Sequence, residues 1–165
     1  MNTVKNAEKQ DWIFSGDTYA CGLRTAGVLI QNGCILLQRD AGGDEYALPG
    51  GHVQVGETTM QALAREWQEE MGVFVTCEKL LWTEECFFEW RGKKNHDLCF
   101  YYLIRAGSDA SLPEATVFTP HRDNPAVEVG WLPIDRLQEV TVYPAFIREE
   151  IHRLDAPISH HIMHA

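Results

Sequence analysis

The sequence predicts an α/β protein in which helices pack on a mixed β-sheet, and three observations support this. Residues 59–71 form one long helix-forming segment without Gly or Pro, with Thr58 before it and Gly72 after it. Runs rich in β-branched and apolar residues lie on both sides of this segment. Two segments that start at or near a proline follow towards the C-terminus and are expected to be helices. The expected architecture is an α/β/α sandwich.

Turn residues and alternation predict the remaining elements. Asn32-Gly33 is expected to be a hairpin turn, and residues 91–95 a polar turn between two long strands. Strands are expected at residues 19–30, 34–39, 46–48, 52–55, 73–88, 97–104 and 128–132, a loop at 106–127, and helices at 133–139 and 144–154.

The whole chain, residues 1–165, is expected to be one domain with a core of about 19–153. Residues 1–18 are expected to be a leader or an edge element, and residues 155–165 a tail. The histidines of this tail are expected on a disordered or surface segment rather than in a metal site.

The composition is that of a globular protein and excludes several classes of function. The formal net charge of −10 argues against a nucleic-acid polymer or an anionic membrane as partner. No stretch is apolar enough to span a bilayer, and residues 1–14 lack the apolar region of a secretory signal. The five cysteines have no CxxC spacing, which predicts reduced thiols in a cytoplasmic protein; they are Cys21, Cys34, Cys77, Cys86 and Cys99.

Carboxylates gather on one side of the expected helix. At about 100° per residue, Glu66, Glu69 and Glu70 fall within an arc of about 100°. The adjoining stripe is expected to pack on the sheet and contains Met60, Leu63, Ala64, Trp67 and Met71. Glu57, just before the helix, can point to the same region. Arg65 alone cannot neutralise four acids, so a hard divalent cation is expected there.

For the carboxylates alone, a solvated acidic helix face is the simpler interpretation, but the spacing of the whole segment decides otherwise. It reads Gly51, five residues, Glu57, seven residues, Arg65-Glu66, an apolar residue, any residue, Glu69-Glu70, any residue, Gly72 and Val73. This segment resembles the Nudix box at every required position, with Trp67 in the first apolar place. Residues 47–51 resemble the usual lead-in of that family, and the order of elements resembles a whole Nudix domain.

The resemblance implies a Nudix-type α/β/α sandwich and a role for each residue of the box. Glu66 and Glu70 resemble the main Mg²⁺ ligands, and Mn²⁺ is an expected substitute. Glu69 resembles a further ligand or the general base. Glu57 and the Gly51 carbonyl resemble additional ligands, and Arg65 resembles the residue that orients the carboxylates.

The expected reaction is Mg²⁺-dependent hydrolysis of a phosphoanhydride by in-line attack of water on phosphorus. The expected substrate is a nucleoside diphosphate linked to another moiety, such as a nucleoside triphosphate or an NDP-sugar. Such a small molecule is the expected partner, and the sequence leaves a homodimer open. Glu69 is the favoured base, and Glu114, His121, Asp123 and Glu128 are alternatives outside the box.

Candidates for binding the substrate lie outside the box. Arg24 and Arg39 are on expected strands and could each hold a phosphate through two hydrogen bonds, although an exposed arginine at a strand edge is an equally good interpretation. Four aromatic residues could stack a base, although packing is the simpler role for each; they are Tyr46, Trp82, Phe87 and Trp90. Of these, Tyr46 is the one expected to bind substrate.

Two other functions fit the same fold. A Nudix domain that only senses a nucleotide or binds a partner would often have lost its glutamates, and the complete set argues against this. An isoprenyl diphosphate isomerase would need an extra acid and a thiol around a carbon skeleton, which nothing in the sequence demands.

Overall fold

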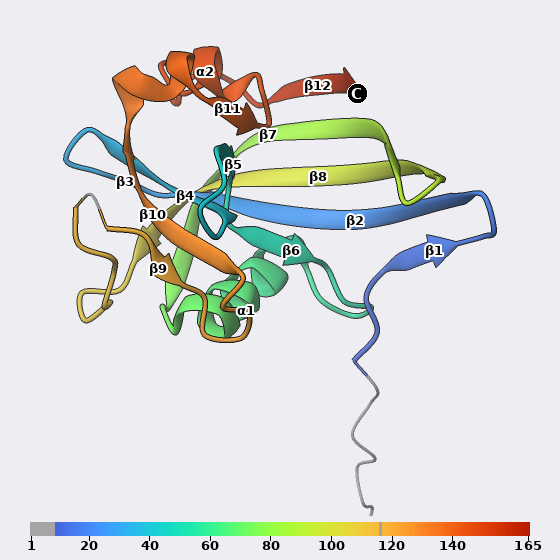
Figure 1. Cartoon of the computed structure of the whole chain (residues 1–165), viewed down its shortest axis with the longest axis horizontal. Helices are drawn as coiled ribbons and strands as arrows, with labels where there is room; N and C mark the ends of the chain where they lie inside the picture. The colour runs from blue at the N-terminus through green and yellow to red at the C-terminus, as the bar shows by residue number, and fades with distance from the viewer. Residues whose placement is uncertain (1–8, 116) are drawn as a thin grey trace, which may run out of the picture.

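The computed structural model describes residues 9–115 and 117–165, which fold into two six-stranded sheets with helices on both sides (Figure 1). The strands are β1 (Ile13–Ser15), β2 (Tyr19–Val28), β3 (Ile30–Gln31), β4 (Cys34–Asp40), β5 (Glu45–Ala47), β6 (Gly50–His52), β7 (Val75–Trp90), β8 (Lys93–Ala106), β9 (Thr119–Pro120), β10 (Val127–Pro133), β11 (Thr141–Tyr143) and β12 (Ser159–His164). The helices are α1 (Thr59–Met71), the 3₁₀ helix η1 (Ile134–Glu139) and α2 (Ile147–Glu150). Both sheets mix parallel and antiparallel pairs, which confirms the predicted α/β/α sandwich.

The first sheet has the strand order β1-β2-β8-β7-β12, with β6 also paired to β2. Its centre is the long antiparallel hairpin of β7 and β8. The turn residues Arg91 and Gly92 have φ of 50° and 75°, as in two-residue hairpin turns. Because β6 pairs with β2, Gly51 lies opposite Thr25. The start of the box is therefore fixed against the middle of this sheet.

The second sheet has the strand order β11-β5-β4-β10-β9, with β3 also paired to β4. Asn32 and Gly33 join β3 to β4 with φ of 50° and 75°, which confirms the predicted hairpin turn. Strand β10 pairs with β4 along its whole length, so Glu128 lies opposite Arg39.

Strand β4 separates the two parts of the core, because successive side chains of a strand point to opposite faces. Ile35 packs in a buried cluster with Ile147, next to α2. Leu36 packs in a second buried cluster with Trp67 of α1. In Figure 1, α2 and α1 accordingly lie on opposite sides of the sheets.

Helix α1 has the predicted bounds, and three of the five residues of its predicted packing stripe are buried. The buried residues of the helix are Ala62, Leu63, Trp67 and Met71. Met60 is instead 49% exposed and Ala64 is half-buried, and neither belongs to the buried cluster under the helix.

The C-terminal region differs most from the prediction. The expected helix at 144–154 is α-helical only in α2, and the segment at 134–139 is a 3₁₀ helix. Of the two alternatives for the tail, a disordered or a surface segment, the structure shows a surface strand, since β12 runs parallel to β7 and places the half-exposed segment with Ile162 beside Glu85. At the other end, β1 is an edge strand, as one of the two alternatives for residues 1–18 proposed; residues 1–8 lie outside the described part.

The structure also bears on the predictions about the cysteines and about membrane-spanning segments. All five cysteines are free thiols. Across residues 9–115 and 117–165, every helix is too short or too polar to cross a membrane.

Candidate active site

Helix α1 presents the site, and both of its ends are capped. The Thr58 side chain accepts a hydrogen bond from the Gln61 backbone N–H, and the Gln61 side chain accepts one from the Thr58 backbone N–H. Gly72 ends the helix in the left-handed conformation with a φ of 68°. These caps fix the frame on which the glutamates are carried.

Arg65 lies at the centre of three carboxylates. Its Nε donates to Glu57 at 2.7 Å, and its Nη1 donates to Glu66 at 2.7 Å and to Glu69 at 3.1 Å. Its Nη2 donates to the second oxygen of Glu57 and to the His52 carbonyl, both at 3.0 Å. One guanidinium therefore ties the loop before the helix to the carboxylate face of the helix.

The surroundings shift the pKa values of Glu57 and Glu66 in opposite directions. Hydrogen bonds from Arg65 hold the pKa of Glu57 below its usual value. Burial raises the pKa of Glu66, and Arg65 partly opposes that rise. Glu69 is the most open of the set, 43% exposed, and also pairs with Lys9 at 3.2 Å.

Glu70 is the unusual member of the set. Burial, followed by the negative charges of Glu66 and Asp123, raises its pKa to about 8, and Arg24 partly opposes this rise. One of its carboxyl oxygens is buried without a hydrogen-bond partner. A buried carboxyl oxygen without a partner lowers the stability of the fold unless a cation or a hydrogen-bond donor binds it.

A loop from the far end of the domain docks against the end of α1. The Arg122 backbone donates to the Glu70 carbonyl at 2.7 Å. This contact places the buried His121 side chain 3.9 Å from the Glu70 carboxyl. Burial lowers the pKa of His121, and its Nε2 has no partner. Two of the distal candidates, His121 and Asp123, thus lie beside the helix, whereas Glu128 pairs with Arg39.

The two glycines at the start of the box are required by close contacts. A Cβ on Gly51 would overlap the Glu66 carboxylate, and a Cβ on Gly50 would overlap the Thr25 carbonyl. Only glycine lets the loop, the sheet and the carboxylate approach in this way.

The two predicted phosphate-binding arginines have different surroundings. Within the described residues Arg24 forms no ion pair, and its charge is close enough to affect the pKa of Glu70. Arg39 binds Glu128 at 2.7 Å and the Tyr46 hydroxyl at 3.1 Å, and it stacks over Phe118 at 4.0 Å. The polar groups of Arg39 and Tyr46 therefore bind each other, and their role towards substrate stays a prediction.

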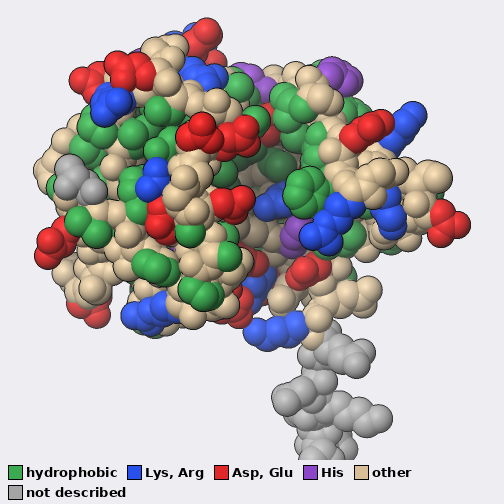
Figure 2. Space-filling view, viewed as in Figure 1, with side chains coloured by type: hydrophobic (Ala, Val, Ile, Leu, Met, Phe, Trp, Pro, Cys, Tyr) green, Lys and Arg blue, Asp and Glu red, His purple; other side chains and the backbone are tan. Residues whose placement is uncertain are grey.

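A cleft of about 450 Å³ runs between the two sheets and is lined by Arg24 and Gly50 at the box. Opposite them its lining includes Glu84, Tyr101 and Tyr143. The face shown in Figure 2 is hollowed between the two sheets, with acidic and basic side chains at the margins of the hollow.

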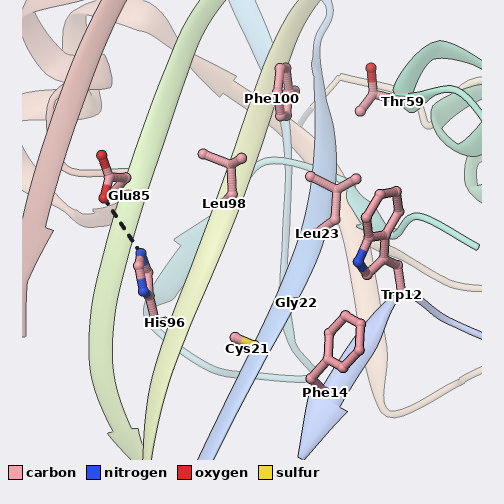
Figure 3. Close-up of a pocket in the computed structure, with 10 residues that line it drawn as sticks. All are labelled: Trp12, Phe14, Cys21, Gly22, Leu23, Thr59, Glu85, His96, Leu98 and Phe100. Carbon is pink, nitrogen blue, oxygen red and sulfur yellow. Dashed lines mark ion pairs between the residues drawn. The ribbon is translucent and has the colours of Figure 1, made fainter.

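A larger hollow, of about 680 Å³, lies on the other face of the first sheet (Figure 3). Strand alternation places Leu98 and Phe100 in it, whereas Cys99 points into the cleft. Its walls are mainly apolar, and its charged contact is the pair of Glu85 and His96 at 3.5 Å. The smaller cleft meets the box through Gly50 and Arg24, whereas the glutamates of the box line neither hollow.

Glu84 and His52 were not among the residues predicted from the sequence. Glu84 alternates with Trp82 and Cys86 on one face of β7, and a carboxyl group on such a partly apolar face could have indicated its role. Two aromatic candidates for base stacking are otherwise engaged, since Trp82 is buried in the core and Phe87 stacks on His96.

Comparison with known proteins agrees with this geometry. The NUDIX domain model matches residues 23–154. A Mycobacterium tuberculosis (strain CDC 1551 / Oshkosh) protein named "Putative mutator protein MutT4" is 30% identical over 99 residues, which are 59% of this chain and 36% of that protein. The chain thus matches little more than a third of the length of this relative.

Solved structures share the fold. The mMutator MutT protein from Bacillus halodurans has a TM-score of 0.60 and 17% identity over 85% of this chain and 89% of that chain. A UDP-X diphosphatase has a TM-score of 0.56 and 21% identity over 89% of this chain and 69% of that chain. The sandwich and the complete box are those of a NUDIX domain. The chain belongs to the NUDIX domain family.

Proposed function

We propose that this protein hydrolyses the phosphoanhydride bond of a nucleoside diphosphate linked to another moiety, such as a nucleoside triphosphate or an NDP-sugar. One observation carries the proposal. Arg65 gathers three carboxylates beside Glu70, one of whose buried carboxyl oxygens has no hydrogen-bond partner among the described residues. Arg24, which forms no ion pair in the same part of the chain, is close enough to affect the pKa of Glu70. The arrangement joins an oxygen-rich cation site to a cation that can hold a phosphate.

The family implies a divalent cation, and the donor set fits Mg²⁺, with Mn²⁺ as a substitute. In the described residues no three His, Cys, Asp or Glu side chains form a complete metal cage. Glu66 and Glu70 would hold the cation together with substrate phosphates and water, and Glu57, Glu69 and the Gly51 carbonyl are proposed as further ligands. The unpartnered oxygen of Glu70 is the observation that supports this fit.

When bound, such a cation would neutralise phosphate charge and favour the ionisation of water. The side chains of the chain itself supply the other requirements. Arg24 would orient the phosphate, Arg65 keeps the carboxylates in position, and Glu69 would accept the proton of the attacking water. Glu69 is the most solvent-accessible carboxylate of the set, so an attacking water can reach it.

Hydrolysis by the whole protein would test the proposal. Purified protein with Mg²⁺ would be assayed against deoxynucleoside triphosphates, NDP-sugars, ADP-ribose and dinucleoside polyphosphates. We expect turnover of at least one of them, and Glu70→Gln to remove most of it while leaving the circular dichroism spectrum unchanged. Glu78→Gln, which changes an exposed carboxylate outside the site, is the matched control.

Two outcomes would contradict the proposal. Near-full activity of Glu70→Gln would contradict its role as a ligand. The absence of turnover on the whole panel would favour a Nudix-fold nucleotide sensor or interaction module.

The cellular compartment and the partners of the protein are also proposals. Five free cysteines support a reducing compartment, and we propose the cytoplasm. Neither a nucleic-acid polymer nor a membrane is an expected partner, in line with the net charge of −10. A homodimer stays a prediction, which light scattering of the purified protein would check.

A further inference from the structure

The cleft between the sheets contains a carboxyl group that the hydrolytic chemistry does not use. Glu84 lines the cleft and is 2% exposed. Its Oε2 accepts a hydrogen bond of 2.6 Å from the buried Tyr101 hydroxyl. Its Oε1 is buried and has no hydrogen-bond partner among residues 9–115 and 117–165. A buried oxygen without a partner is costly, and a ligand that donates to it would remove that cost.

The sheet places Glu84 at a fixed distance from Arg24. Arg24 is in register with Cys99 on β8, and Cys99 is in register with Glu84 on β7. All three residues line the same cleft. Two strand spacings separate the backbones of Arg24 and Glu84 by about 10 Å. This separation matches, to order of magnitude, the distance from the phosphate of a nucleotide to the far edge of its base.

We propose that Glu84 selects the substrate by accepting a hydrogen bond from an exocyclic amino group of the nucleobase, with Tyr101 as the positioning residue. This inference rests on the proposed function, whose substrate class it narrows to nucleotides with amino-bearing bases. Tyr143 and Met163 line the same cleft and offer apolar surface to a planar base. Arg24 then lies at the phosphate end and Glu84 at the base end.

The chemistry of a carboxyl group accounts for the choice of an amino group. An ionised Glu84 accepts from the N1–H and the 2-amino group of guanine. A protonated Glu84 accepts from the amino group of adenine or cytosine and donates to the ring nitrogen beside it. An oxo group in place of the amino group puts an acceptor against an ionised Glu84, whose oxygens can only accept. A protonated Glu84 can donate to an oxo group, so a preference for the amino member of a pair identifies Glu84 as the acceptor at that position.

Equilibrium binding of hydrolysis products tests the inference without requiring turnover. Isothermal titration calorimetry with Mg²⁺ would compare pairs of nucleoside monophosphates that differ at one exocyclic group: CMP with UMP, AMP with IMP, and GMP with IMP. We expect the wild-type protein to bind the amino member at least about tenfold more tightly in one or more pairs.

Variants of two residues then assign that preference. Glu84→Gln keeps the shape of the side chain and leaves its oxygen to accept from Tyr101, which turns the amide NH₂ to the ligand. This variant should abolish or reverse the preference. Tyr101→Phe keeps the carboxyl group but removes the hydrogen bond that holds it in position, and should reduce the preference about threefold or more. Glu85→Gln is the control, because Glu85 is the next residue and faces the hollow of Figure 3.

The outcomes separate this inference from the proposed function. The inference is wrong if the wild-type protein shows no preference in any pair. It is also wrong if both Glu84→Gln and Tyr101→Phe keep the wild-type preference, because Glu84 then does not recognise the base. If wild type binds no monophosphate and hydrolyses none of the panel, the proposed function itself fails. Circular dichroism of each variant would exclude misfolding as the cause of lost binding.

Discussion

The guanidinium of Arg65 binds the carboxylate of Glu57 through two hydrogen bonds, from Nε to Oε1 at 2.7 Å and from Nη2 to Oε2 at 3.0 Å. The pair connects the loop before α1 to the second turn of that helix. A planar guanidinium fits a carboxylate in this way, whereas an ammonium group acts as a point charge. The geometry of the site therefore depends on arginine and not only on a positive charge.

Replacement of Arg65 by lysine would test this dependence. We expect Arg65→Lys to lower kcat about 10- to 100-fold, the usual effect of losing a residue that orients metal ligands. The Mg²⁺ concentration for half-maximal activity should rise as well, because Glu66 loses a fixed partner. Steady-state kinetics across a Mg²⁺ series would measure both. Wild-type kinetics in Arg65→Lys would show that charge alone suffices.

The two glycines before the helix should respond differently to the same substitution. Gly51→Ala puts a methyl group against the Glu66 carboxylate, so Glu66 must move and activity should fall at least about tenfold. Gly50→Ala puts it against the Thr25 carbonyl, which belongs to the backbone of the sheet, so the main loss should be in stability. Thermal unfolding and kinetics of both variants would distinguish the two effects. Equal stability losses would contradict the distinction.

The parts predicted most accurately from the sequence are those fixed by local interactions. Thr58 and Gly72 mark the ends of α1 because capping uses only neighbouring residues. The turn at Asn32-Gly33 likewise depends on two residues that tolerate positive φ. Periodicity also placed the glutamates on one side of the helix.

The parts that the sequence did not predict depend on distant contacts. Ser159–His164 becomes a strand because the edge of β7 is available to it, and no local pattern reveals that edge. His121 reaches Glu70 only because the Arg122 backbone binds the end of α1. Arg39 has a typical strand pattern, and its partner Glu128 is 89 residues away. A single sequence does not encode such pairings in its local periodicity.

Arg24 and Arg39 offer a direct comparison between a free and a paired arginine. Arg24→Ala should raise KM about tenfold or more, because Arg24 lines the cleft and forms no ion pair in the described part of the chain. Arg39→Ala should chiefly lower the midpoint of thermal unfolding, because it leaves Glu128 and the Tyr46 hydroxyl without their partner. Kinetics and calorimetry on both variants would check this. A rise in KM for Arg39→Ala alone would assign the phosphate to Arg39.

Burial of Glu84 should make the stability of the ligand-free protein depend on pH. Burial raises the pKa of Glu84 above its usual value, and the hydrogen bond from Tyr101 partly opposes this rise. Between the unfolded pKa of ~4.3 and the higher folded pKa, the folded state binds more protons than the unfolded state. The contribution of Glu84 to the free energy of unfolding therefore falls as pH rises through that window.

Glu84→Gln stays neutral and should lack this dependence, so its stability relative to wild type should increase with pH and then level off. Tyr101→Phe removes the hydrogen bond that lowers the pKa of Glu84, and should extend the window to higher pH. Urea unfolding at a series of pH values would measure the differences between the three proteins. Parallel curves for wild type and Glu84→Gln would show that Glu84 ionises alike in the folded and unfolded chains, which would contradict a desolvated carboxyl in the cleft.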